Sequence, residues 1–315
     1  MVKSEVTNVC LIGCGSVGRR HLEAMLKVKH DINIEVVEPN IGATTDTPHT
    51  QNIKYFSKIE EVSDNIDICV IATTADIRKK IVIELVSKKN VKFIILEKIV
   101  FQNENDFDEI IKLFKQKNIK SWVNCHLRIE PIYEEVKKQS IITEDTIITY
   151  DYSNNFTLST SAIHILDLFS YLCDDYNLKI ENIVTDTELK PSRHNGCLDF
   201  NGEMEVTNTN GGRLLVRRRD ADFGEHLTVH HQDLIIRSSE GDNPDDGVGF
   251  VQDKKIPYIH QSSLTNLYIN DIIKKSDCNL STLENSAKLH KVMLKSFRKL
   301  LKENYKCEVV DCPVT

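Results

Sequence analysis

The spacing of apolar positions divides the chain into two parts with different patterns. Up to residue 122, short apolar runs typical of buried strands alternate with longer segments in which apolar side chains recur at helical spacing. The strand candidates are Val9–Ile12, Ile32–Val37, Ile66–Ala72, Val91–Leu96 and the run that begins at Lys120. The helix candidates are the segment after Gly18 and residues 76–89 and 104–117. This order predicts a doubly wound parallel sheet whose ligand lies at the carboxyl ends of the strands.

The pattern changes after residue 122. Helical spacing is expected near Pro131 and over 161–173, and strand patterns dominate from there on. A hairpin-turn sequence, Asn208–Gly212, separates two of these strands, Glu203–Val206 and Arg213–Arg219. Other expected elements are strands at 197–200, 227–230 and 233–237, a surface loop at 240–247 and a helix at 282–303. We therefore predict a doubly wound α/β domain at 1–122 and an α+β domain at 123–315 whose sheet is open and mainly antiparallel.

A glycine motif follows the first strand directly. Gly13, Gly15 and Gly18 form a GxGxxG pattern between a strand and a helix, where the first glycine permits the tight turn and the second lets the backbone approach a pyrophosphate. Glu38 follows the second strand, twenty residues past Gly18, where a carboxylate can bind the ribose diol. Because no Arg or Lys occurs in 39–44 to hold a 2′-phosphate, we expect NAD rather than NADP.

Composition narrows the class of protein. The net charge of −7 argues against a nucleic-acid partner. The beginning of the sequence lacks the apolar core of a signal peptide, and no apolar run is long enough to cross a membrane. Nine scattered cysteines form no CxxC and no zinc pattern, so we expect reduced thiols, no metal and a cytoplasmic location.

Four landmarks, taken in order, resemble the Gfo/Idh/MocA oxidoreductases, the glucose–fructose oxidoreductase and inositol dehydrogenase group. They are the glycine motif with His21 three residues beyond it, the Glu97-Lys98 pair at a strand end, the segment Asn124–Pro131 with Arg128, and the His164-x-x-Asp167 motif. The resemblance covers nearly the whole chain. It implies a Rossmann domain followed by a substrate-binding domain whose open sheet pairs between subunits in a homodimer or homotetramer.

The same resemblance indicates where coenzyme and substrate bind. Beside Gly13, Gly15, Gly18 and Glu38, we assign the coenzyme site to Ser16, Val17, Ala72, Thr73, Glu97 and Lys98. The substrate site is assigned to Lys98, His126, Arg128, His164 and Asp167.

The chain also departs from the family pattern at four positions. Ile99 replaces the Pro that follows the lysine, and Thr74 and Arg78 replace a Pro and a His after the Ala-Thr strand end. Thr160 stands where the family often carries an Asp one turn before the histidine. These changes leave the coenzyme fold in place and weaken the case for the family's sugar-dehydrogenase mechanism.

Hydride transfer at a hydroxyl-bearing carbon needs a base and a group that stabilises the developing alkoxide. Lys98 at a strand end can stabilise that charge. The alternative interpretation is that Lys98 is an ordinary surface lysine. His164 is the candidate base because histidine titrates near neutral pH. Asp167 lies on the same helix face and is the third catalytic candidate, expected to orient the imidazole or to contact a substrate hydroxyl. The alternative for His164 is a core histidine satisfied by a backbone carbonyl.

Cationic groups in the second domain point to an anionic substrate, or else to a solvated sheet face or an oligomer contact. They are Arg128, His126, Arg193, His194, Arg217 and Arg219. Arginine forks suit carboxylates and phosphates, which would favour an acidic or nucleotide-activated sugar.

Three hypotheses of function follow. The favoured one is an NAD-dependent oxidoreductase acting on a sugar, a nucleotide sugar or another sugar derivative, as a dehydrogenase or as an epimerase that retains its coenzyme. The second is a non-catalytic protein that senses NAD(H) or a sugar. The third is a reductase of a non-carbohydrate acceptor, which could use Lys98 without His164.

Overall fold

The computed structural model describes residues 6–40, 52–139, 146–153, 156–185, 189–219, 225–230, 234–239, 248–251, 254–257, 259 and 261–315. The chain divides into two compact units. The first comprises Met1–Phe101, Asn105–Asn124 and Gln261–Leu283, and the second comprises Gln102–Glu104, Cys125–His260 and Glu284–Thr315. Residues 261–283, which a boundary at residue 122 leaves in the second domain, make their contacts with the first unit.

The first unit is built on a sheet in the order β17-β6-β5-β4-β1-β2-β3. Its strands are β1 (Thr7–Ile12), β2 (Ile32–Val37), β3 (Ile53–Phe56), β4 (Asn65–Ile71), β5 (Asn90–Leu96), β6 (Lys120–Val123) and β17 (Ser281–Thr282). Strands β1 to β6 are parallel, and β17 is antiparallel to β6. The chain reverses direction across the sheet between β1 and β4, which is where a doubly wound sheet binds its ligand.

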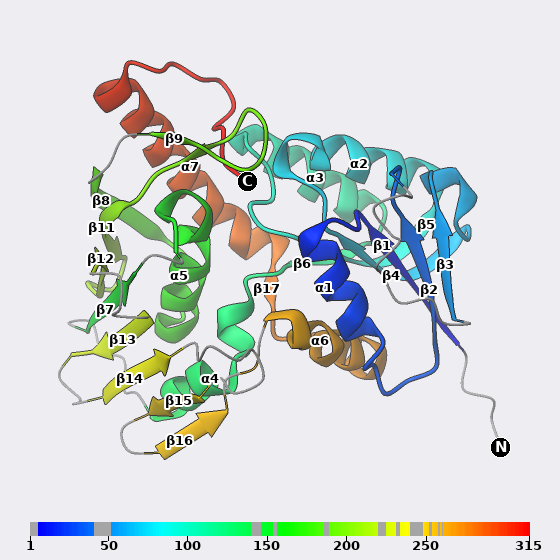
Figure 1. Ribbon diagram of the computed structural model, residues 1–315, viewed down its shortest axis with the longest axis horizontal. Coiled ribbons are helices and arrows are strands. Elements are labelled where there is room, and N and C mark those ends of the chain that lie inside the picture. Colours follow the sequence, from blue (N-terminus) through cyan, green and yellow to red (C-terminus); the bar gives the residue numbers. More distant parts are fainter. Residues whose placement is uncertain are drawn as a thin grey trace. The chain divides into compact units, whose positions relative to one another are not determined.

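Helices cover both faces of this sheet. They are α1 (Ser16–Met25), α2 (Ala75–Lys88), α3 (Glu104–Gln116) and α6 (Gln261–Lys275), with a 3-10 turn η2 at Ile59–Glu61. Helices α2 and α3 lie on one face, and α1 and α6 pack against each other on the opposite face (Figure 1). Strands covered on both faces are mostly apolar, and β1 is buried from Val9 to Ile12. The predicted doubly wound sheet is confirmed.

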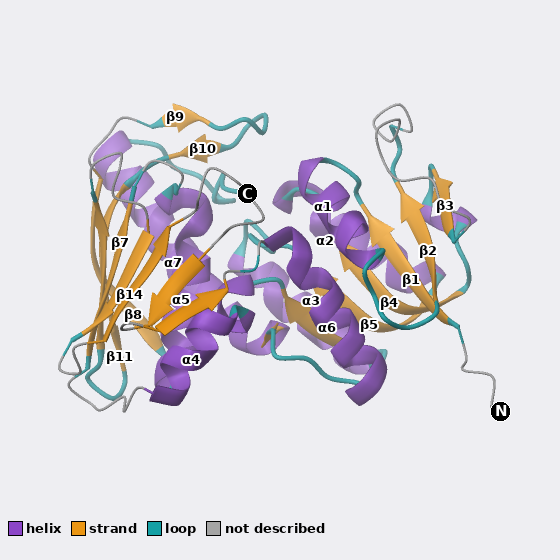
Figure 2. Cartoon of the chain, turned by 60° about the horizontal axis from the view of Figure 1, so that its bottom comes forward, coloured by secondary structure: helices purple, strands orange, loops and turns teal. Residues whose placement is uncertain are grey.

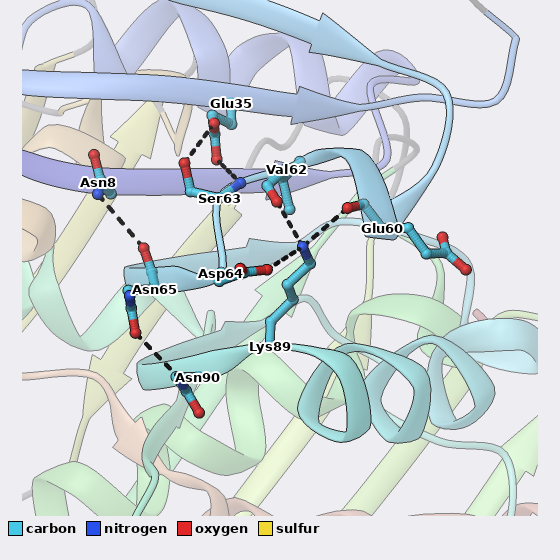
Figure 3. Close-up of polar contacts among 9 residues, drawn as sticks. All are labelled: Asn8, Glu35, Glu60, Val62, Ser63, Asp64, Asn65, Lys89 and Asn90. Atoms are coloured by element: carbon cyan, nitrogen blue, oxygen red, sulfur yellow. Dashed lines mark hydrogen bonds and ion pairs between the residues drawn. The ribbon is translucent and has the colours of Figure 1, made fainter.

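A buried lysine holds the amino ends of the strands, opposite the ligand-binding edge. Lys89 Nζ donates hydrogen bonds to the carbonyls of Glu60 and Val62, at 3.0 and 2.6 Å, and to the Asp64 carboxylate at 3.0 Å (Figure 3). The ammonium is thus paired with three oxygens, which offsets the cost of burying its charge. Figure 3 also shows Asn8, Asn65 and Asn90 linked across the starts of β1, β4 and β5.

The second unit is built on an open sheet in the order β16-β15-β14-β13-β7-β12-β11-β8. Its strands are β7 (Ile147–Tyr152), β8 (Leu178–Thr185), β11 (Gly202–Asn208), β12 (Arg213–Arg218), β13 (Glu225–Val229), β14 (Leu234–Ser239), β15 (Val248–Val251) and β16 (Lys254–Pro257). The helices are η3 (His126–Ile129), α4 (Pro131–Gln139), α5 (Leu158–Cys173) and α7 (Leu283–Tyr305). Figure 2 shows α4, α5 and α7 on one face of the sheet. The predicted antiparallel character is confirmed for most pairs.

Two of the strand pairings in this unit were not predicted from the sequence. Strands β12 and β13 follow each other in sequence, but β7 lies between them and pairs parallel with β12 and antiparallel with β13. The strand expected at 197–200 is β10 (Leu198–Asp199), which pairs with β9 (Lys190–Pro191) in a separate two-stranded sheet. Local turn signals cannot show which distant strand inserts between two neighbours. The loop expected at 240–247 lies outside the described residues.

All nine cysteines are free thiols. Among the described residues, no helix combines the length and the apolar character that a membrane span requires.

Candidate functional site

The glycine loop after β1 depends on the absence of side chains at two positions. Gly13 has a φ of 90°, and a Cβ there would lie 3.0 Å from the carbonyl group of Ala72. A Cβ on Gly18 would lie 2.0 Å from the Gly13 carbonyl oxygen, which no rearrangement of a flexible side chain could relieve. A Cβ on Gly15 would meet no atom within 4 Å. Gly13 and Gly18 are therefore required by the fold, whereas Gly15 keeps open the space in front of helix α1.

Glu38 reaches the same loop from the end of β2. The Cys14 amide donates a hydrogen bond to Glu38 Oε2 at 2.8 Å, and the Asn40 amide donates one to Oε1 at 3.1 Å. Burial, and then the Glu38 charge, raise the pKa of the Cys14 thiol to about 11, so this cysteine is an uncharged packing group. Two motifs separated in sequence thus meet at the start of α1.

The residues present fit a dinucleotide. Helix α1 begins at Ser16, directly after the open loop, so the unpaired amides of its first turn face that loop and favour an anion. The Ala72 amide donates to the Ile12 carbonyl at 2.8 Å, which places the Ala72–Thr73 turn beside the glycine loop. Gly13, Gly15, Ser16, Val17, Gly18, Glu38, Ala72 and Thr73 therefore share the carboxyl edge of the sheet around β1 and β4.

Glu97 and Lys98 follow β5 at the same edge, and Glu97 ends a buried chain of polar groups. His21 Nε2 lies 2.8 Å from Glu97 Oε1, and Asn124 also donates to this oxygen. On the other side of the ring, His21 Nδ1 lies 2.8 Å from the Thr265 hydroxyl, to which Tyr268 donates at 3.0 Å. The chain joins α6 and α1 to the residue that precedes Lys98.

The buried Glu97 carboxyl is ionised. Burial acts to raise its pKa, but the hydrogen bond and charge of His21, the hydrogen bond from Asn124 and the charge of Lys98 outweigh burial and lower the pKa to about 2. Because the ordinary value is 4.5, the folded state is stabilised fully above that pH, and this stability is lost as the pH falls toward 2.

Glu97→Gln is expected to remove this acid-sensitive stabilisation. A pKa drop from 4.5 to about 2 corresponds to about 3 kcal/mol in the free energy of unfolding, all of it present at neutral pH. Urea unfolding followed by the fluorescence of Trp122, the single tryptophan and a buried residue of the first unit, measures it. The difference between wild type and variant should shrink as the pH is lowered, and Glu23→Gln, at an exposed position on α1, should show no such trend. A difference that does not change with pH would contradict the lowered pKa of Glu97.

The second unit brings four of the proposed substrate residues into one buried cluster. Arg128 Nη1 donates to the Tyr176 hydroxyl at 2.9 Å and lies 3.4 Å from Asp167 Oδ1. His126 and His164 pack edge to face, with ring centroids 4.6 Å apart. All four proposed residues are at most 9% exposed, so their charges act in a medium of low dielectric constant. His164 and Asp167 both lie on α5, which is buried along most of its length.

Three of the six cationic residues that suggested an anionic substrate, Arg128, Arg217 and Arg219, are paired with acids. Burial acts to lower the pKa of the Arg128 guanidinium, but the charge of Asp167 opposes this effect and the pKa is raised. The Nε atoms of Arg217 and Arg219 both donate to Asp151 Oδ1, at 3.2 and 2.8 Å. The two arginines share one face of the sheet, as predicted, but their shared partner is a carboxylate of this chain.

Several residues of these clusters have no motif in the sequence. Tyr176 is 48 positions from Arg128, and no spacing rule links them. Glu130 is fully buried, and burial raises its pKa to about 8 despite the hydrogen bond donated by the Ile259 amide. The described residues contain no group of three or more His, Cys, Asp or Glu side chains that could hold a metal ion.

Residues 7–125 match the sequence profile of the Gfo/Idh/MocA group, described as an oxidoreductase family with an NAD-binding Rossmann fold. The first unit is a Rossmann domain of this family. The match spans the glycine loop, Glu38, the Ala72–Thr73 turn and Lys98. The resemblance seen in the sequence is therefore confirmed. The family model describes an NAD-binding domain, which gives the coenzyme class of this unit.

Solved structures share the fold of nearly the whole chain. Myo-inositol dehydrogenase from Lactobacillus casei, in complex with NAD(H) and myo-inositol, matches with a TM-score of 0.69 and 18% identity over 95% of each chain. UDP-N-acetylglucosamine 3-dehydrogenase GnnA from Acidithiobacillus ferrooxidans matches with a TM-score of 0.68 and 10% identity over 93% of this chain and 96% of that chain. A super-repressor mutant of Gal80p from Saccharomyces cerevisiae matches with a TM-score of 0.68 and 17% identity over 93% of this chain and 95% of that chain.

At these identities the structural likeness establishes the fold alone. No curated protein sequence matches the chain. The departures from the family pattern are visible in the structure: Thr74 stands at the N-cap position of α2 without a side-chain capping hydrogen bond, Arg78 is a buried residue of that helix, and the Lys98–Ile99 peptide bond is cis. Thr160 lies in the first turn of α5, where its hydroxyl pairs with that of Thr157.

Proposed function

We propose that the chain is an NAD-dependent oxidoreductase that acts on the hydroxyl or keto carbon of a sugar or sugar derivative. The observation that supports this most strongly is the contact between Glu38 and the Cys14 amide, which puts a ribose-binding carboxylate on the glycine loop of an oxidoreductase-family domain. When bound, the nicotinamide supplies the group that accepts or donates hydride.

Lys98 and His164 are proposed to perform complementary chemistry. The ammonium of Lys98, two residues beyond β5, stabilises negative charge on the substrate oxygen, while ionised Glu97 beside it favours the charged amine. The imidazole of His164 accepts the hydroxyl proton during oxidation and returns it during reduction. Asp167 is paired with Arg128, so its role is to hold the cluster around His164 rather than to take the proton.

NAD is proposed as the preferred coenzyme. The Glu38 carboxylate would accept hydrogen bonds from the free ribose hydroxyls of NAD, and it would repel the 2′-phosphate of NADP. Its position 2.8 Å from the Cys14 amide keeps that charge at the loop.

The charges in the second unit favour a neutral sugar or polyol over an acidic one. Arg128 is opposed by Asp167, and Arg217 and Arg219 are opposed by Asp151. A buried cluster that already balances its own charge gives little gain to an added carboxylate, whereas His126, His164 and Asp167 can exchange hydrogen bonds with hydroxyl groups. Nucleotide-activated sugars stay in the test because a sugar ring linked to a nucleotide can still present neutral hydroxyls.

The test is a panel of polyols, free sugars, sugar acids and nucleotide sugars, with NADH absorbance as the readout. We expect oxidation of at least one neutral hydroxyl compound, and a fall in kcat/KM of about 10²–10³ in Lys98→Ala. Lys92→Ala is the matched control, because Lys92 is an exposed lysine of the same strand that pairs with Asp67. Reaction at catalytic NAD without accumulation of NADH would assign an epimerase. Activity of Lys98→Ala equal to that of wild type would contradict the proposed role of Lys98.

A non-catalytic sensor is the second candidate, supported by the structural match to a Gal80p super-repressor and by Thr160 at a position where the family often has a carboxylate. This candidate predicts NADH binding without turnover of any compound in the panel. Turnover that depends on Lys98 would exclude it.

A further inference from the structure

Arg78 is a buried cation with three carbonyl partners near the proposed site. It lies on α2, is 1% exposed, and belongs wholly to the first unit. Its Nη1 donates to the carbonyls of Ile99 and Val100, the latter at 3.0 Å, and its Nη2 donates to the carbonyl of Thr73. Within the described part of the chain, the hydrogen-bond partners of the guanidinium are all backbone carbonyls.

The three carbonyls belong to two segments that have already been assigned to coenzyme and catalysis. Thr73 lies in the turn after β4, at the point where the chain reverses direction across the sheet. Ile99 and Val100 follow Lys98 without a gap. One planar guanidinium therefore ties the coenzyme turn to the backbone that carries Lys98, and a planar group with several fixed donors is suited to hold more than one carbonyl at once.

Burial of such a charge has a cost that the surrounding groups must offset. Burial lowers the pKa of Arg78 to about 10, against the opposing charges of Glu97 and Asp76, so the side chain stays charged at neutral pH. An uncharged side chain would avoid this cost but would leave the three carbonyls without their donor. The buried charge therefore serves to hold the three carbonyl groups in fixed positions.

We infer that Arg78 is a positioning residue that fixes the backbone of Lys98–Val100 against the Thr73 turn and thereby holds the Lys98 amine in one orientation. The inference rests on the proposed function for the role of Lys98. The chain has Arg78 and Ile99 where the resembling family has His and Pro, and the two departures meet, because the Arg78 guanidinium bonds the Ile99 carbonyl. A side chain on α2 here restrains a segment that a Pro ring would otherwise restrain through its own φ angle.

The test compares Arg78→Met and Arg78→Lys with wild type in the full chain. Lys79→Met is the matched control, since Lys79 is the next residue of α2 and forms ion pairs with Asp106 and Glu109. In Arg78→Met we expect amide hydrogen exchange in peptides covering 97–101 and 72–75 to rise by about tenfold while peptides of β1 and β2 keep their rates. Arg78→Lys keeps a charge but loses the fork, so it should show a smaller rise, and Lys79→Met should match wild type.

Kinetics provide the second readout. For Arg78→Met, kcat should fall by about tenfold, while the Kd for NADH changes by less than about threefold, because the amine is misplaced and the glycine loop is intact. Exchange that rises evenly over the first unit, or does not rise at 97–101, would overturn the inference; if Arg78→Met does not fold, Arg78→Lys is judged by the same criterion. A wild-type chain that turns over no substrate would remove the proposed function, whereas the exchange data alone decide whether Arg78 fixes this segment.

Discussion

His164→Ala is expected to lower kcat by about 10²–10⁴ and to leave the Kd for NADH unchanged, as the loss of a well-placed general base does. The histidine is 7% exposed and packs against His126, and it belongs to the second unit rather than to the glycine loop. Its removal should therefore affect proton transfer and not coenzyme binding. Rates should be measured with the best substrate of the panel over a range of pH.

The matched control for His164→Ala is His230→Ala. His230 is exposed and lies on the sheet of the same unit, where its Nε2 is 2.8 Å from the Thr149 hydroxyl. It is distant in sequence from His126 and His164 and has a different partner. It should turn over substrate at the wild-type rate. Full activity in His164→Ala would remove this histidine from the mechanism. If Lys98→Ala is then still inactive, the reductase of a non-carbohydrate acceptor becomes the better hypothesis.

The glycine loop gives the second large effect, because two substitutions of one kind should have opposite consequences. Gly18→Ala is expected to unfold the first unit, since the new Cβ would lie 2.0 Å from the Gly13 carbonyl oxygen. Gly15→Ala is expected to fold like wild type, since its Cβ meets no atom within 4 Å, yet to lose at least about tenfold in NADH affinity because the methyl group occupies space that the pyrophosphate needs.

Trp122 fluorescence and a titration with NADH separate the two effects. The first reports unfolding of the first unit, and the second reports affinity. Gly196→Ala is not a useful control, because Gly196 has a positive φ, unlike Gly15 and Gly18. Gly15→Ala with unchanged NADH affinity would show that the coenzyme does not approach the loop there.

The coenzyme side of the site could be predicted from local patterns. The glycine motif and Glu38 are each defined by a few neighbouring residues, and parallel strands bring their carboxyl ends to one edge of a sheet. The structure adds the contact that joins them, from the Cys14 amide to Glu38. The long helices were also predictable, and α5 and α7 begin and end within a few residues of the expected ranges.

What the sequence left open depends on contacts between distant segments. The sequence around Arg78 does not indicate that its guanidinium donates to the carbonyls of Ile99 and Val100. The sequence around Arg128 likewise does not indicate its hydrogen bond to Tyr176. The insertion of β7 between β12 and β13 is likewise decided by packing of the whole sheet. Helix α6 had a local signal, the buried residues Leu264, Tyr268 and Ile272 at helical spacing, but its packing on α1 through His21 and Thr265 is again a tertiary effect.

The substrate class could not be read from single arginines in the sequence. An arginine suggests an anion-binding site, but its partner is unknown until the fold is known. Here Asp167 and Asp151 are the partners of the arginines, so the proposed substrate is a neutral sugar rather than an acidic one.

The loop from Gly13 to Gly18, with Glu38, is proposed to bind a nicotinamide dinucleotide. Calorimetric titration of the full chain with NADH and NADPH decides whether it does, with Glu38→Gln as the comparison. We expect NADH to bind more tightly than NADPH, and we expect Glu38→Gln to narrow this difference by about tenfold because the repulsion of the 2′-phosphate is removed. A wild-type chain that bound neither coenzyme at millimolar concentration would disprove the proposed coenzyme site.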